Sequence, residues 1–228
     1  MKITFKKIMG ICLSMVLAFN LALPVYAESS DEFEMILNEN DCYFSYKTGN
    51  LIVGKVIEDK IITDIFSVPK DKIKSVTIKD DVSKISENAF YGCKGLKTVT
   101  IPNSVTSVGS GAFSGCTGLT SIDIPNSVTS IGQAAFTGCT GLKEVTIPGS
   151  VTSIGGCAFT GCTGLTSVTI DNGVKEIGDM AFSSCTGLTS INIPDSVKEF
   201  GDVIFIGCTN LRIHANNKYI RSYGLFSK

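Results

Sequence analysis

A strict interval of 23 residues organises most of this 228-residue chain. Phenylalanine and cysteine each recur six times at that interval. They are Phe90, Phe113, Phe136, Phe159, Phe182 and Phe205, and Cys93, Cys116, Cys139, Cys162, Cys185 and Cys208. A fixed period of this length is typical of solenoids, in which each repeat forms one coil and stacks on the next. A lone coil buries too little apolar surface to offset the entropy lost on ordering its backbone, so the coils must stack.

One repeat, residues 119–141, indicates the shape of a coil. Apolar side chains alternate over residues 122–124, which is the period of a strand. The Pro-Asn pair that follows ends the strand, because proline cannot donate to a ladder and asparagine tolerates tight turns. Residues 128–131 indicate a second extended piece before a glycine corner, and residues 135–139 a turn that directs Ala, Phe and Cys inward. Stacking of the longer strands predicts a parallel sheet along one face.

The full repeat reads L-x-x-[VI]-x-I-P-x-S-V-x-x-I-G-x-x-A-F-x-x-C and covers about residues 73–211. This pattern resembles the BspA-like class of leucine-rich repeat proteins, which are bacterial surface proteins. The resemblance implies a mainly-β, right-handed leucine-rich-repeat solenoid of about six 23-residue coils, with a parallel sheet on one face and a cap at each end. It also implies a secreted or cell-surface protein that acts in adhesion. Departures such as Lys79 and Asp171 at the proline position leave this fold prediction intact.

The first 27 residues are predicted to be a signal peptide, cleaved after about Ala27. Three lysines precede an apolar run over residues 8–23, and the small-residue exit before Glu28 favours cleavage over a transmembrane anchor, which is the alternative. We therefore expect a secreted or cell-surface protein. After residue 27, no stretch is long and apolar enough to span a bilayer.

The rest of the chain is predicted to divide into a cap, the repeats and a second cap. The N-terminal cap covers residues 28–72 and contains two strands around a turn at 48–50, although a small separate binding module is also possible. The leucine-rich repeats cover residues 73–210. The C-terminal cap covers residues 211–228, which begin with a truncated repeat strand and supply apolar side chains to close the last coil.

The net charge excludes two classes of partner. Without the three leader lysines, 17 basic residues stand against 21 acidic ones, a balance of −4. This balance argues against nucleic acid and against an anionic membrane surface as the main partner.

The cysteines and phenylalanines are predicted to be structural. Equivalent Cβ atoms in neighbouring coils would lie about 4.8 Å apart, farther than the ~3.8 Å of a disulfide, so we expect six buried free thiols. The phenylalanine rings should stack as a spine inside the solenoid. Cys42 and Cys157 fall outside this spacing and are assigned no role.

Catalysis and metal binding are not expected. His214 is the only histidine and is predicted to lie on the surface of the C-terminal cap. Paired acids, a phosphate-binding glycine loop and clustered metal ligands are absent from the sequence, so we predict no enzyme and no cofactor.

The outward positions of the long strands are the best candidates for binding. They are mostly hydroxyl-bearing, with lysines toward the N-terminal half. The candidate residues are Lys74, Lys97, Thr100, Asp123, Lys143, Glu144 and Thr146. They favour a binding scaffold for an extracellular protein or cell-surface ligand, with the lysines favouring an acidic partner. A structural surface protein, a glycan-binding solenoid or a face that is merely solvated remain alternatives.

Overall fold

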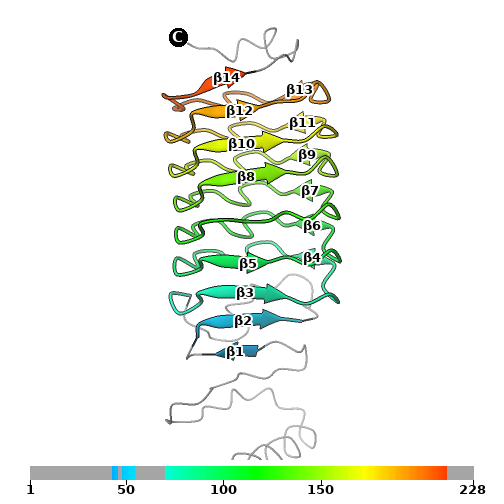
Figure 1. Cartoon of the computed structure of the whole chain (residues 1–228), viewed down its shortest axis with the longest axis vertical. Coiled ribbons are helices and arrows are strands. Elements are labelled where there is room, and N and C mark those ends of the chain that lie inside the picture. Colours follow the sequence, from blue (N-terminus) through cyan, green and yellow to red (C-terminus); the bar gives the residue numbers. More distant parts are fainter. Residues whose placement is uncertain (1–42, 46–47, 55–69, 215–228) are drawn as a thin grey trace, which may run out of the picture.

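The computed structural model describes residues 43–45, 48–54 and 70–214, and in this part of the chain all regular structure is β-strand. Successive coils stack along one axis, so that equivalent strands lie one above another (Figure 1). The longer strands are β2 (Asn50–Val53), β3 (Ser75–Ile78), β5 (Thr98–Thr100), β8 (Glu144–Ile147), β10 (Ser167–Ile170), β12 (Ser190–Asn192) and β14 (Arg212–His214). Together with β1 (Tyr43–Ser45) they form what we call the long-strand face.

The strands of the long-strand face pair in parallel and in register with the repeat. Ser167 in β10 lies opposite Ser190 in β12, one period further along the chain. At the N-terminal end, β1 and β2 form the expected pair of strands, antiparallel and joined by a turn in which Gly49 has a φ of 72°. Because β2 also pairs in parallel with β3, the stack begins before the first recognisable repeat.

The long-strand face is interrupted at the fourth coil, and here the strand prediction is wrong. Residues 121–124 form no strand, so the face consists of two four-stranded sheets, β1-β2-β3-β5 and β14-β12-β10-β8. Backbone bonds of 3.3 Å from Thr120 to Lys97 and from Lys143 to Thr120 still join the coils. We attribute the interruption to Asp123, because aspartate is depleted in strands.

A second sheet of shorter strands runs without a break along another face. Its parallel order is β13-β11-β9-β7-β6-β4. The strands are β4 (Lys84–Ile85), β6 (Ser107–Val108), β7 (Ser130–Ile131), β9 (Ser153–Ile154), β11 (Glu176–Ile177) and β13 (Glu199–Phe200). The extended piece predicted over 128–131 is therefore strand β7, and we call this sheet the short-strand face.

Glycine at the corner after each short strand allows the coils to approach closely. A Cβ atom on Gly178 would lie 2.7 Å from the backbone nitrogen of Gly156 in the preceding coil. The amide of Gly178 meanwhile donates to the carbonyl of Ile154 at 2.8 Å. A side chain at this corner would therefore separate two coils that share a hydrogen bond.

The core is a set of stacked side chains. The six phenylalanine rings lie with neighbouring centroids 5.1–5.9 Å apart and nearly parallel planes. The repeat cysteines are free thiols, buried except for the half-buried Cys208. Each thiol from Cys116 onward donates to the carbonyl of a phenylalanine 26 residues earlier, for example Cys139 Sγ to Phe113 O at 3.2 Å. The thiols thus act as small core residues that also satisfy backbone carbonyls.

Burial keeps these thiols protonated. It raises the pKa of Cys93 to about 12, against the lowering effect of the Lys70 charge. Burial also raises the pKa values of Cys116 and Cys139. Because the thiolate is the reactive form, the core thiols are chemically quiet in the folded protein.

Candidate functional site

The long-strand face presents all seven candidate residues to solvent. Alternation along each strand buries the apolar side chains and leaves the intervening positions outside, as in β8, where Val145 and Ile147 are buried and Glu144 and Thr146 are exposed. The other five, Lys74, Lys97, Thr100, Asp123 and Lys143, are also exposed. Neighbouring coils place equivalent residues side by side along the stack.

The lysines form a pair and an outlier rather than one stripe. Lys97 lies directly beside Lys74, because its amide donates to the carbonyl of Lys74 at 2.8 Å. Thr120 stands between Lys97 and Lys143. Positive charge on this face is therefore concentrated in the first two repeats, and a partner that needs all three ammonium groups must span four coils.

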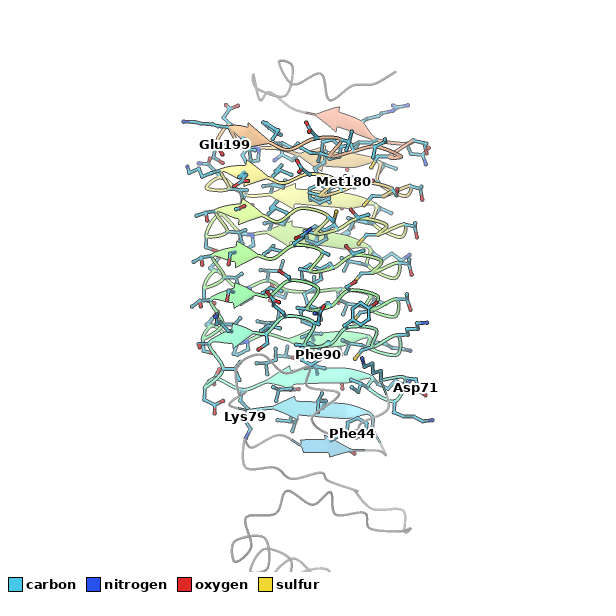
Figure 2. All side chains as sticks on the ribbon, turned by 180° about the vertical axis from the view of Figure 1, so that it is seen from behind. Phe44, Asp71, Lys79, Phe90, Met180 and Glu199 are labelled. Atoms are coloured by element: carbon cyan, nitrogen blue, oxygen red, sulfur yellow. The ribbon has the colours of Figure 1, made fainter. Side chains whose placement is uncertain are left out.

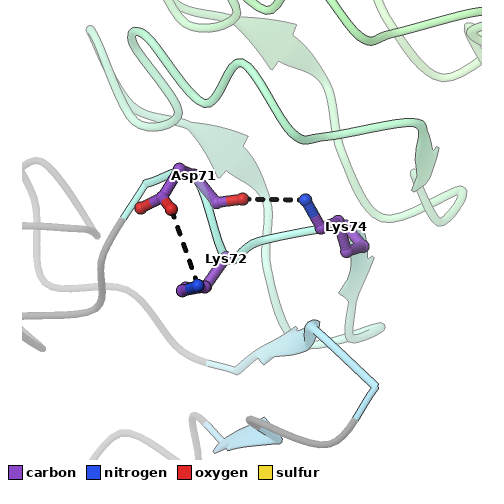
Figure 3. Close-up of polar contacts among 3 residues, drawn as sticks. All are labelled: Asp71, Lys72 and Lys74. Carbon is purple, nitrogen blue, oxygen red and sulfur yellow. Dashed lines mark hydrogen bonds and ion pairs between the residues drawn. The ribbon is translucent and has the colours of Figure 1, made fainter.

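The sequence around Asp71 adds a further lysine at that end. The Nζ atom of Lys74 donates to the carbonyl oxygen of Asp71 at 2.9 Å, and Lys72 Nζ lies 3.9 Å from Asp71 Oδ2 (Figure 3). A Cβ atom on Gly95 would lie 2.9 Å from Lys74 Nζ, so the absence of a side chain there leaves room for the ammonium group. The exposed Lys72–Asp71 pair contributes little to stability.

The hydroxyl groups of the face fall into two classes. Thr120, Thr166 and Thr189 each donate their hydroxyl to a carbonyl of the preceding coil, at 3.1–3.3 Å. In contrast, the hydroxyls of Thr100 and Thr146 have no partner within the described ranges. Only the second class offers a free donor to a ligand.

These free hydroxyls flank a carboxylate. Thr100, Asp123 and Thr146 are equivalent positions of three successive coils, and they lie across the interruption between β5 and β8. The core is slightly more exposed here, with Val99 and Ile122 at 8% compared with 2% for Val168. Glu144 lies opposite Ser167 in the next coil. The centre of the face therefore combines two free hydroxyls with two carboxylates.

One charged residue of the face was missed from the sequence. Arg212 in β14 is exposed and lies opposite Ser190, one residue out of step with the 23-residue period. The shift places Ile213 opposite Ile191, since the inward alternation of apolar residues fixes the register. The pattern Leu-x-Ile at 211–213, one residue shorter than Leu-x-x-Ile, was the signal for this shift. His214, the sole histidine, lies opposite Asn192.

An open groove of about 580 Å³ lies beside the short-strand face near the C-terminal end. Its lining includes Gln133, Gly156 and the carboxylates of Glu176, Asp179 and Glu199. Figure 2 shows Glu199 on this side of the stack. The described residues contain no group of three or more His, Cys, Asp or Glu side chains that could hold a metal ion.

A membrane-spanning helix is likewise absent from the ranges that the structure describes.

Comparison with known proteins decides the family. The model of the BspA type leucine-rich repeat region, present in six copies, matches residues 59–163 and 138–227. The chain belongs to the BspA type leucine-rich repeat family. The 23-residue coil, the stacked phenylalanines and the parallel sheets described above are thus the structure of BspA type repeats in this chain.

Solved structures of leucine-rich repeat proteins resemble this BspA type chain. The leucine-rich repeat protein TpLRR of T. pallidum is 25% identical, with a TM-score of 0.63 over 89% of this chain and 97% of that chain. A leucine-rich repeat protein from Bacteroides ovatus is 27% identical, with a TM-score of 0.48 over 82% of this chain and 64% of that chain. The pneumococcal vaccine antigen PcpA is 19% identical, with a TM-score of 0.52 over 83% of this chain and 52% of that chain. A search of curated proteins found no match.

Proposed function

We propose that this chain is a secreted or cell-surface binding scaffold that attaches to an extracellular protein through its long-strand face. The observation that carries the proposal is the exposure of Lys74, Lys97, Thr100, Asp123, Lys143, Glu144 and Thr146 on one face of a continuous stack. Repeat solenoids use extended surfaces of this kind for binding. Adhesion to host or matrix components is the role that the family favours.

The chemistry of the face favours a weak, polar contact strengthened by several attachment points. Exposed side chains on it are hydroxyls, lysines and carboxylates, and large aromatic anchors are absent from its described positions. The two adjacent lysines, Lys74 and Lys97, favour an acidic region of the partner. We propose binding rather than catalysis, since the face brings together no nucleophile with a base.

A charge-reversal series tests the proposal. The protein, freed of its expected leader, is titrated against a panel of extracellular matrix proteins, together with a Lys74→Glu, Lys97→Glu, Lys143→Glu variant. The matched control reverses Lys84, Lys175 and Lys198, which are also exposed but belong to the other side of the stack. Saturable binding lost in the first variant and kept in the control supports the long-strand face. Loss in both variants, or in the control alone, contradicts it.

A glycan ligand is the second candidate, and the free hydroxyls of Thr100 and Thr146 favour it. They stand two coils apart, which is about 10 Å at the spacing of neighbouring strands. Replacing both with valine keeps the shape and strand propensity but removes the hydroxyls. If a glycan is the ligand, the double variant loses binding to a glycan array while protein binding is unchanged.

A further inference from the structure

Backbone amides in the turns of the solenoid form a ladder that runs forward along the chain. The first amide of each turn donates to a carbonyl 22 residues later, at 2.7–2.9 Å. These bonds join Asn88 to Ser110, Gly111 to Gln133, Ala134 to Gly156, Cys157 to Asp179 and Met180 to Asp202. The phenylalanine amides do the same, and the last of these bonds joins Phe182 to Ile204 at 3.1 Å. Every coil therefore depends on the next coil for acceptors.

The last described coil lacks these acceptors. The amides of Val203 and Phe205, the next members of the two ladders, have no hydrogen-bond partner within the described ranges. Phe205 is only 9% exposed, and backbone amides that are buried this far are seldom left unpaired. Counting forward 22 residues places the missing acceptors at Leu225 and Ser227.

The same end of the stack exposes apolar side chains. Val203 is 49% exposed and Ile206 is 54% exposed, whereas large apolar residues in the middle coils are buried. Met180, one coil earlier, is 40% exposed and lies on the same side as Val203 (Figure 2). Strand β14 has already begun another coil by pairing with β12.

Residues 215–228 carry the rest of the pattern needed for that coil. Ile220, Tyr223 and Gly224 follow Val197, Phe200 and Gly201 by 23 residues each. They reproduce the V-x-x-I-G segment that forms a short strand and its glycine corner in the coils before. The family match also extends to residue 227.

Only one register fits the end of the stack. A step of 22 residues would place Ser222 over Phe200 and Tyr223 over Gly201. At Gly201, even a Cβ atom would collide with the backbone of Asp179, so no side chain belongs on that corner. The 23-residue step instead stacks glycine on glycine and an aromatic ring on Phe200. It requires one extra residue in the turn after β14, which the Asn216-Asn217 pair accommodates.

We propose that residues 215–228 dock on the last coil as half of a seventh coil. Ser222 and Tyr223 add a strand beside β13, and the amide of Gly224 donates to the carbonyl of Phe200. The carbonyls of Leu225 and Ser227 accept from the amides of Val203 and Phe205. Leu225 and Phe226 lie against Val203 and Ile206. This closure is separate from ligand binding on the long-strand face and does not depend on it.

Hydrogen exchange and thermal unfolding of the full chain test this docking. A Gly224→Val variant should place a side chain against the glycine corner of the last coil, lower the melting temperature by several degrees and speed amide exchange at Val203 and Phe205 at least tenfold. Ser222→Val is the matched control, because the same valine would then sit on an outward position. It should leave both measurements unchanged. A chain ending at residue 214 should reproduce the fast exchange of the Gly224→Val variant.

Three outcomes would overturn the proposal. The first is fast exchange of Val203 and Phe205 in the unaltered chain. The second is an equal effect, or no effect, of the valine at positions 222 and 224. The third is protection that rises with protein concentration, because the docked segment would then belong to a second copy of the chain.

Discussion

At the residue scale, the repeat cysteine shows how one side chain serves two purposes. Its thiol fills the space beside the phenylalanine stack and also donates to a phenylalanine carbonyl of the core. The carbonyl would otherwise lack a partner in a dry interior, so an alanine at this position would lose both packing and a hydrogen bond. The thiol is weakly polar, which suits a site where a charged or larger group would not fit.

The raised thiol pKa values predict a loss of stability at alkaline pH. An unfolded cysteine titrates near pH 8.5, whereas Cys93 has a pKa of about 12 in the folded protein. The unfolding free energy should therefore be fully retained below about pH 8 and fall as the pH rises toward 12. Urea unfolding at about pH 8 and about pH 10 measures the fall.

Other groups also titrate at alkaline pH, and a second variant separates their effect. Replacing Cys116 and Cys139 by alanine removes two of the buried thiols and should make the fall with pH shallower. An equally steep fall in this variant would assign the pH dependence to lysines and tyrosines instead.

Two glycines of neighbouring columns should differ sharply in their tolerance of a side chain. On Gly178 a Cβ atom would lie 2.7 Å from a backbone nitrogen, whereas on Gly156 the nearest atom would be 3.4 Å away. We expect Gly178→Ala to lower the unfolding free energy by about 1–3 kcal/mol and Gly156→Ala to change it little. Equal values for the two variants in urea unfolding would show that the coils are not held apart by the added methyl group.

At the element scale, the long strands show where sequence reasoning succeeds and where it fails. The alternating apolar residues predict strands β3, β8 and β10 correctly, because their outward positions carry residues that strands tolerate. The same alternation is present at residues 121–124, yet no strand forms there. The periodic pattern reports which side chains are buried, but it does not report whether neighbouring backbones come close enough to pair.

Position 123 provides a test of this interruption. Asp123→Thr gives the fourth coil the residue found at Thr100 and Thr146, so we expect residues 121–124 to join β5 and β8 in one continuous sheet. The gain in unfolding free energy should be about 0.5–1 kcal/mol. Amide exchange at Ile122 and Val145 should slow at the same time.

The reverse substitution is the control. Thr169→Asp places a carboxylate at the equivalent position of β10, where the sheet is intact, and should speed exchange at Val168. If exchange in Asp123→Thr stays as fast as in the unaltered chain, the interruption has a cause other than the aspartate.

The candidate site could be predicted only in outline. Exposure of Lys74 or Thr146 follows from the strand period alone. Which hydroxyls are free does not, because the bond from Thr120 to the carbonyl of Lys97 depends on the distance between two coils. The place of Arg212 depends on a one-residue change of register that strict counting by 23 conceals.

At the scale of the whole molecule, stability should be a sum over coils and their contacts. Deleting residues 142–164 removes one full period and joins two equivalent positions, so the remaining coils can restack. We expect a folded, cooperative protein whose urea m-value is lower by about one-sixth, since m follows the surface exposed on unfolding. Circular dichroism and urea titration measure both properties.

Phase, rather than length, should decide the outcome. Deleting residues 142–153, about half a period, places strand residues over turn residues and should abolish cooperative unfolding. A cooperative transition in this shorter deletion would mean that the coils are not tied to one another by their register.

The opposite directions of the coil-to-coil bonds have an electrostatic consequence. On the long-strand face, Lys97 donates backward to Lys74, while in the turns Phe90 donates forward to Ala112. Peptide dipoles therefore point both ways along the axis and largely cancel, unlike those of an α-helix, which add up to about half a charge at each end. The two poles of this molecule carry no built-in backbone charge, so the attraction of ions or partners to either pole is set by side chains alone.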